Sequence, residues 1–73
     1  MTYYNPKFSL GQKVKFYDNL ILNNEVKSQT ITVYGEVSKI LVCKDIIQER
    51  TFYMYELDSG DVVNEINLMS REG

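Results

Sequence analysis

The sequence contains no histidine, no tryptophan and no alanine, and Cys43 is its only cysteine. Without histidine, the chain cannot build a zinc site of histidine and cysteine or a nucleophile activated by histidine. A single cysteine cannot form an intrachain disulfide and fits a reducing compartment, so we expect a cytoplasmic location. Cys43 ends an apolar run, which predicts a buried and unreactive thiol.

Long apolar runs are also missing. The longest, at positions 40–43, is far shorter than the roughly 20 residues of a membrane-spanning helix. The first residues, MTYYNPKFSLGQ, lack the apolar core of a signal peptide, so we expect no membrane partner. The 73 residues predict one domain over 1–73. So short a chain buries only about 60% of its unfolded surface, which predicts a small core.

The net charge is small, but the charges are unevenly placed along the chain. The net charge is −2, but residues 1–44 carry six basic against three acidic side chains, and residues 45–73 carry two against seven. The two parts therefore have charges of +3 and −5. An acidic balance disfavours strong non-specific binding to nucleic acid, because that binding depends on summed phosphate neutralisation. The positive first part still leaves room for a local basic face.

Much of the sequence shows the alternation of apolar and polar residues that is typical of β-strands. QKVKFY alternates strictly, which places Val14 and Phe16 on one face of a strand and Lys13, Lys15 and Tyr17 on the other. TFYMYELD alternates in the same way, with Tyr53, Tyr55 and Leu57 on one face and Phe52 and Met54 on the opposite face. The core that we predict consists of Val14, Phe16, Val37, Tyr55, Leu57 and Leu68.

Residues 19–30 separate the first two strand signals and predict a long hairpin-like excursion. Asn23 and Asn24 tolerate positive φ, so they mark its tip. In TITVYGEVSKILVC the apolar parity switches near Ser38 and Lys39, which indicates a bulge or bend, and Gly35 indicates a close approach of another segment. DSGD, at 58–61, reads as a turn in which Gly60 supplies positive φ. The segment 64–67 is expected to hold one helical turn.

One stretch is ambiguous. GEVSKILVCKDIIQER, at 35–50, has some apolar spacing typical of a helix, although its β-branched residues favour a strand. Within it, residues 44–50 fit a loop, a helical turn or the end of a hairpin.

The order of these motifs resembles the small SH3-like barrels of bacterial and phage proteins, of the Tudor-like and KOW-like group. It runs from G-x-x-V-x-F at Gly11 through G-x-V-x-x-I at Gly35 to Y-x-Y-x-L-x-x-G-x-x-V at Tyr53 and E-x-x-L at Glu65. The resemblance implies an all-β, small five-stranded barrel with a long excursion after the first strand. The segment that grips proline-rich peptides in eukaryotic members is absent, and so are the basic neighbours of the KOW glycine.

The sequence offers few residues that could form a catalytic or metal-binding site. Asp58, Asp61 and Glu65 are close in sequence, but they lack the spaced ligands of a calcium loop and fit a solvated turn. We therefore expect no enzyme activity, no metal and no cofactor.

Two function classes remain open. The first is a non-catalytic protein-interaction or accessory module, with Phe52, Met54, Tyr17 and Tyr34 as partner-binding residues. The partner would be another protein or a second copy in a homodimer, unless the excursion itself folds across Phe52 and Met54. A phage or mobile-element origin is a special case that no residue distinguishes. The second class is a weak nucleic-acid binder whose basic and aromatic face includes Lys13, Lys15 and Lys39.

Overall fold

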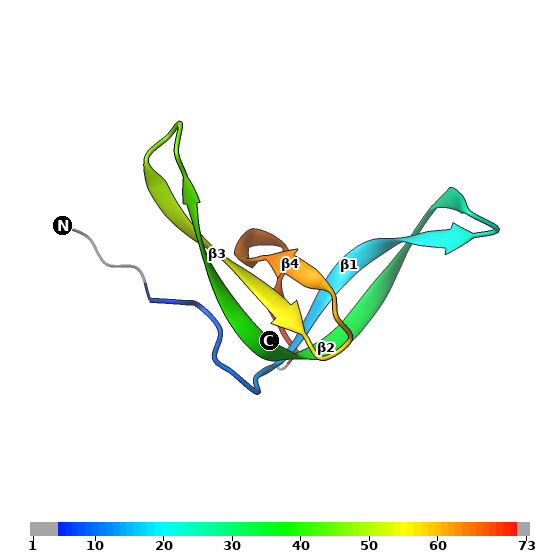
Figure 1. Cartoon of the computed structure of the whole chain (residues 1–73). Coiled ribbons are helices and arrows are strands. Elements are labelled where there is room, and N and C mark those ends of the chain that lie inside the picture. Colours follow the sequence, from blue (N-terminus) through cyan, green and yellow to red (C-terminus); the bar gives the residue numbers. More distant parts are fainter. Residues whose placement is uncertain (1–4, 72–73) are drawn as a thin grey trace.

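The computed structural model describes residues 5–71, and this part of the chain is all-β. Its elements are β1 (Lys13–Leu22), β2 (Glu25–Asp45), β3 (Arg50–Leu57), β4 (Val62–Asn64), a 3-10 turn η1 (Glu65–Asn67) and β5 (Met69–Ser70). The strands form one antiparallel sheet in the order β4-β3-β2-β1-β5 (Figure 1). β4 and β5 are its two edges and no ladder joins them in the described residues, so the sheet is open.

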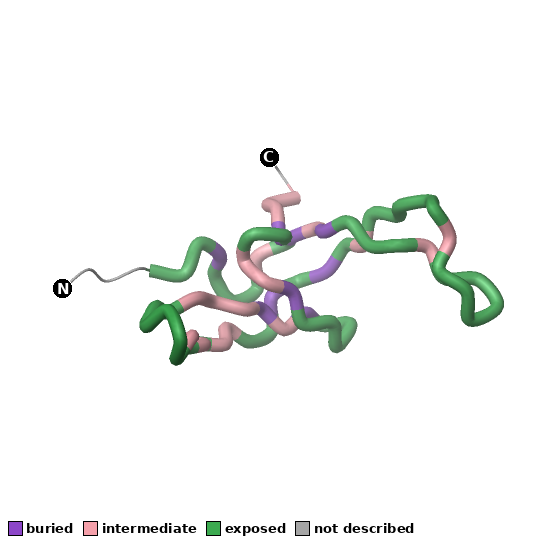
Figure 2. Tube along the Cα trace, turned by 90° about the horizontal axis from the view of Figure 1, so that it is seen from above, coloured by how far each residue is buried: buried purple, intermediate pink, exposed green. Residues whose placement is uncertain are grey.

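The predicted core is confirmed. Its six residues are all buried, and Val14 and Tyr55 have no exposed surface at all. Phe8 and Val63 complete the buried cluster: Phe8 packs edge-on against the ring of Tyr55, with 5.4 Å between ring centroids. The cluster lies where the strands cross, and in Figure 2 the exposed ends of the molecule extend away from it on both sides.

β2 serves both halves of the sheet because it bends. Its residues up to Glu36 pair with β1, and its residues from Val37 pair with β3. The register shifts between Val37 and Lys39, where the sequence predicts a bulge. Gly35 lies at this bend, buried against the turn that follows β3. The bend makes two diverging limbs, which Figure 1 shows as a V.

The first limb contains the predicted excursion. Residues 18–31, here called the β1–β2 arm, extend both strands into a two-stranded ribbon. Its tip is formed by Asn23 and Asn24 at φ 54° and 63°. The arm points away from β3 in both views, so the alternative in which it covers Phe52 and Met54 is wrong (Figures 1 and 2).

The second limb contains the stretch whose secondary structure was ambiguous in the sequence. β2 continues to Asp45, a turn occupies 46–49, and β3 starts at Arg50, so the helical alternative for 35–50 is wrong. Asp45 Oδ1 accepts hydrogen bonds from the backbone N–H of Ile47 and of Gln48 at 3.0 and 3.2 Å. A side chain that caps its own turn in this way competes with helix formation. Glu49 completes the turn at φ 53°.

The 3-10 turn sits where the sequence predicts a helical turn, and it closes one end of the core. Asn64 caps it by accepting from the N–H of Ile66 at 3.2 Å. Glu65 Oε2 accepts from the Tyr55 hydroxyl at 2.6 Å and from the Lys7 N–H at 3.0 Å, and the Tyr55 oxygen accepts from the Phe8 N–H at 3.3 Å. These contacts fasten the lead-in segment and η1 to β3.

Burial, followed by the hydrogen bond to Glu65, raises the pKa of Tyr55 above its ordinary value of 10.0. The unfolded chain loses this proton near pH 10, whereas the folded chain keeps it to higher pH. The stabilisation is therefore complete below about pH 10 and is lost as the pH rises through the folded pKa. We expect the free energy of unfolding to fall over this range in the wild type and to fall less in Tyr55→Phe, as measured by urea titration. Tyr17→Phe removes an exposed hydroxyl and should keep the wild-type slope; equal slopes in all three proteins would contradict this assignment.

Candidate functional site

No concentrated chemical centre is found among residues 5–71. No group of three or more histidine, cysteine, aspartate or glutamate side chains lies close enough there to hold a metal ion. In the same range, no helix is both long and apolar enough to span a bilayer. Cys43 is half-buried rather than buried, opposite Phe52 in the β2–β3 ladder. The surfaces that stand out are instead apolar and aromatic.

One such surface is the arm. Ile21, Leu22, Val26 and Ile31 are between 41% and 68% exposed. The arm has no third strand, because β5 pairs only with Val14 and Lys15 of β1, and β3 begins to pair with β2 only at Val37. A two-stranded ribbon alone is marginally stable in water. The arm is therefore an exposed ribbon with unpaired edges and apolar side chains.

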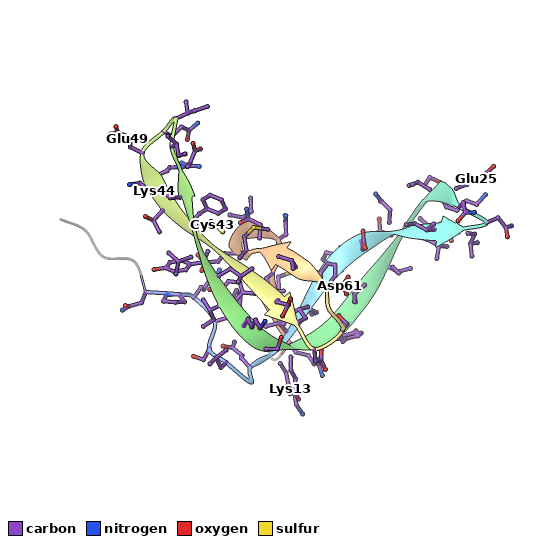
Figure 3. All side chains as sticks on the ribbon, in the orientation of Figure 1. Lys13, Glu25, Cys43, Lys44, Glu49 and Asp61 are labelled. Carbon is purple, nitrogen blue, oxygen red and sulfur yellow. The ribbon has the colours of Figure 1, made fainter. Side chains whose placement is uncertain are left out.

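The overall dimensions show how far the limbs project. The radius of gyration is 14.0 Å, and the extents are 47 × 30 × 20 Å. A compact chain of this length would have a radius of gyration of about 11 Å. Figure 3 places Glu25 at the tip of the arm and Glu49 at the tip of the other limb, at opposite ends of the molecule. That second tip carries Ile46 and Ile47, at 84% and 94% exposed.

A shallow groove at the base of the arm brings together two of the predicted partner-binding residues. Tyr17 lines it from β1 and Met54 from β3, and Phe16, Val62, Val63 and Asn67 complete much of its wall. Tyr17 is 58% exposed, and Met54 is half-buried. The groove runs between β4 and the part of β1 that does not pair with β5, and no ladder in the described residues closes this seam.

Phe52 lies elsewhere. It lines a second hollow with Tyr53, Arg50 and Ile66, beside the 3-10 turn. Like Met54 it is half-buried, so strand alternation overstates its exposure. Phe52 and Met54 thus face two different hollows rather than one flat patch.

Most of the residues of the predicted basic and aromatic face lie on the same face of β1 and β2. Lys13, Lys15 and Tyr17 alternate along β1, and Tyr34 is directly opposite Lys15 in the ladder. Tyr34 is 58% exposed, and the guanidinium carbon of Arg71 lies 5.2 Å from its ring centroid. Figure 3 shows Lys13 on the convex side of the bend.

Two acidic residues weaken this face. Glu36 is opposite Lys13 in the ladder. Lys39 lies beyond the bulge, on the limb shared with β3, where its Nζ is 3.7 Å from Glu56 Oε2. The sequence places Lys39 close to the other lysines along the strand, but the bend of β2 separates it from them.

Sequence reasoning missed the arm's aliphatic surface as a candidate site. The signal was present as Leu20, Ile21 and Leu22, but an isolated apolar run does not reveal whether it is covered. Residues 28–30 were assigned to the excursion and 31–34 to the strand that follows it, without any indication that one edge of this stretch is open.

Comparisons of the chain with protein-family models, with curated proteins and with solved structures find no match.

Proposed function

We propose that this chain is a non-catalytic protein-interaction module whose contact surface is the β1–β2 arm and the groove at its base. The observation that carries the proposal is the exposure of aliphatic side chains on a ribbon that no other part of residues 5–71 covers. Exposed apolar surface that is contiguous typically marks an interaction site. Tyr17 and Met54 extend the surface into the groove, and aromatic and methionine side chains are enriched at interface cores.

We propose further that the fold is an SH3-like barrel with an open seam. The five antiparallel strands, the bend in the second strand and the 3-10 turn before the last strand support this assignment. The seam between β1 and β4 is the same groove that Tyr17 and Met54 line. A chain bound there would extend the small core of eight buried hydrophobic side chains.

The test is a paired substitution at each tip. Ile21 and Val26 face one another across the arm, at 61% and 68% exposed, so replacing both by Ser changes the surface with little cost to folding. Ile46→Ser with Ile47→Ser makes the same chemical change on the other limb. With immobilised protein and a lysate of the native host, we expect the arm variant to lose most of the partner that the wild type retains.

The control variant at 46 and 47 should retain that partner. Circular dichroism checks that both variants keep the wild-type strand content. If the arm variant captures every protein that the wild type captures, the arm is not the contact surface and the proposal is wrong.

A second candidate function is weak binding of single-stranded nucleic acid. It is favoured by the alignment of Lys13, Lys15, Tyr17 and Tyr34 on one face of β1 and β2, because bases stack on exposed rings while lysines contact phosphates. Salt separates the two functions: phosphate contacts weaken steeply as salt rises, whereas apolar contacts do not.

A further inference from the structure

The structure adds a cation to the basic and aromatic face. Arg71 follows β5, and its backbone N–H donates to the Lys13 carbonyl at 3.1 Å. Its side chain lies across the sheet, where Nη2 donates to the carbonyl oxygens of Gly35 and Val14, at 2.8 and 3.4 Å. Nε is buried, and no acceptor in residues 5–71 reaches it. Main-chain carbonyls therefore fix the position of the guanidinium, but no carboxylate of the described residues pairs with its charge.

Tyr34 lies beside this guanidinium. Its ring centroid is 5.2 Å from the guanidinium carbon of Arg71, within the range of a cation–π contact. The residue is still 58% exposed, so its ring remains accessible to a ligand. On the same face, Lys15 is directly opposite Tyr34, and Tyr17 is its diagonal neighbour. The β1–β2 surface thus combines two exposed rings with a lysine and a fixed guanidinium.

A small hollow continues this face beyond Lys15. Its lining consists of Lys7, Phe8, Lys15, Leu68, Met69 and Ser70. Phe8 and Leu68 belong to the buried core, so the floor of the hollow is apolar. The Lys7 ammonium lies 5.8 Å from the Phe8 ring centroid, and neither lysine forms an ion pair with another of the described residues. The hollow therefore offers an apolar contact next to two positive charges.

Positive charge is concentrated along this surface, here called the cationic strip. It comprises the hollow, Tyr34 and the cations Lys7, Lys13, Lys15 and Arg71. Two carboxylates lie at its margins: Glu36 is opposite Lys13 in the ladder, and Glu65 accepts from the Lys7 N–H at 3.0 Å. The strip keeps a net positive charge, although the whole chain has a charge of −2. An anionic ligand with aromatic parts matches this combination.

We propose that the cationic strip binds single-stranded nucleic acid over two nucleotides. One base stacks on the Tyr34 ring, the next base covers the hollow beside Met69, and the phosphate between them contacts Lys15. Arg71 positions the Tyr34 ring and contacts one flanking phosphate, and Lys7 contacts the other. The inference rests on the second candidate function, to which it gives a defined site, and it does not depend on the protein contact proposed for the arm.

The spacing of the strands supports two bases. Tyr34 is opposite Lys15 on β1, and Lys15 is opposite Met69 on β5, so the three residues form one row across the sheet. Adjacent strands are roughly 4.8 Å apart, which places Lys15 midway between two base positions about 10 Å apart. An acidic peptide would match the cations but has no base to stack on the ring, and a duplex hides its bases. A single strand meets both requirements.

The first test measures the binding of a fluorescein-labelled ten-nucleotide oligothymidylate by fluorescence anisotropy at several salt concentrations. The wild type should bind saturably at low salt. The logarithm of its association constant should fall with the logarithm of the salt concentration at a slope of about −2, as three phosphate contacts of a single strand predict. Arg71→Met should weaken binding and reduce the size of this slope by about 0.7, because it removes one contact.

The matched control is Arg50→Met, which changes the net charge equally at the chain's other arginine, on the opposite limb. It should leave both affinity and slope close to those of the wild type. Arg71→Lys should restore the slope but not the full affinity, because an ammonium group does not reproduce the planar contact with Tyr34. Circular dichroism checks that each variant keeps the wild-type strand content.

The second test concerns stacking. Tyr34→Leu should weaken binding at least about fivefold and leave the salt slope unchanged, because it removes a ring but no charge. Tyr34→Phe keeps the ring and should bind like the wild type. With 5-iodouracil in place of thymine, irradiation should join the oligonucleotide to Tyr34, as identified by mass spectrometry of the digested complex.

The possible failures are distinguishable. Absence of saturable binding at low salt would overturn both this site and the second candidate function. Binding that withstands Arg71→Met and Tyr34→Leu would keep that function and overturn the site. Competition by decaglutamate as effective as that of unlabelled oligonucleotide would show that only charge is recognised, which also overturns a base-binding site. The paired substitutions at 21 and 26 should leave oligonucleotide binding unchanged, and a loss there would contradict the assignment to the cationic strip.

Discussion

Leu57→Ala should cost about 2–5 kcal/mol of folding free energy, the usual range for a fully buried leucine. Leu57 is 1% exposed and lies opposite Val37 at the point where β2 bends. A chain of this length has a total stability of roughly 4–11 kcal/mol. The substitution therefore removes a large share of that total and is expected to leave a substantial unfolded population, measured as a lowered urea midpoint.

The matched control is Leu22→Ala, the same change at a residue that is 50% exposed near the tip of the arm. It should cost about 1 kcal/mol or less, because half of the side chain already contacts water. Comparable losses for both leucines would show that the buried cluster is not the structural centre of the molecule.

Gly35→Val should be the second most damaging change, for a different reason. A Cβ at position 35 would lie 3.0 Å from Asp58 Oδ1, 3.2 Å from Leu57 Cδ1 and 3.3 Å from Leu57 Cβ. The side chain would push away the Asp58 turn that closes the edge of β2. Overpacking of this kind typically costs about 1–3 kcal/mol, and Val, with two further methyl groups, should cost more than Ala.

The two sites are in contact, so their effects should couple. Leu57→Ala removes atoms that the new Cβ would meet, and the double variant Gly35→Ala, Leu57→Ala should therefore lose less stability than the sum of the single changes. Thr32→Val, on the same strand but exposed, serves as the control for a β-branched substitution. Strict additivity at 35 and 57 would contradict the close approach of β2 and β3 at this point.

Local patterning predicted most of the core. Alternation at 13–17 and 51–57 grouped Val14 with Phe16 and Tyr55 with Leu57, and all four are buried, as are the predicted Val37 and Leu68; Phe8 and Val63 were not predicted. The turns were equally predictable, because Asn23, Asn24 and Gly60 adopt the positive φ that their residue types tolerate. These features depend on interactions within a few residues of each position.

Long-range geometry was not predictable in the same way. Alternation assigns Phe52 and Met54 to one face, but it does not reveal that one lies beside the 3-10 turn and the other beside β1. Likewise, Lys39 follows Tyr34 closely in sequence, yet the bulge and bend of β2 move it to the other limb. The outcome depends on which segments meet across the bend, and no single strand pattern contains that information.

The exposure of the arm has the same origin. Its strands are long because β1 and β2 continue pairing well past the core, so their outer halves gain ladder hydrogen bonds but no third layer or neighbouring strand. A ribbon built in this way is a natural acceptor for one more strand, since its unpaired backbone groups supply affinity and its alternate side chains supply specificity.

Residue-resolved amide hydrogen exchange tests most directly whether another chain completes the arm. In dilute wild-type protein, the amides of 30–34 that point away from β1 should exchange quickly, because no strand in residues 5–71 covers that edge. In a complex captured through the arm, these amides should become protected, while the amides of 62–64 should be unchanged. Exchange at 30–34 that stays the same in both states would contradict the account.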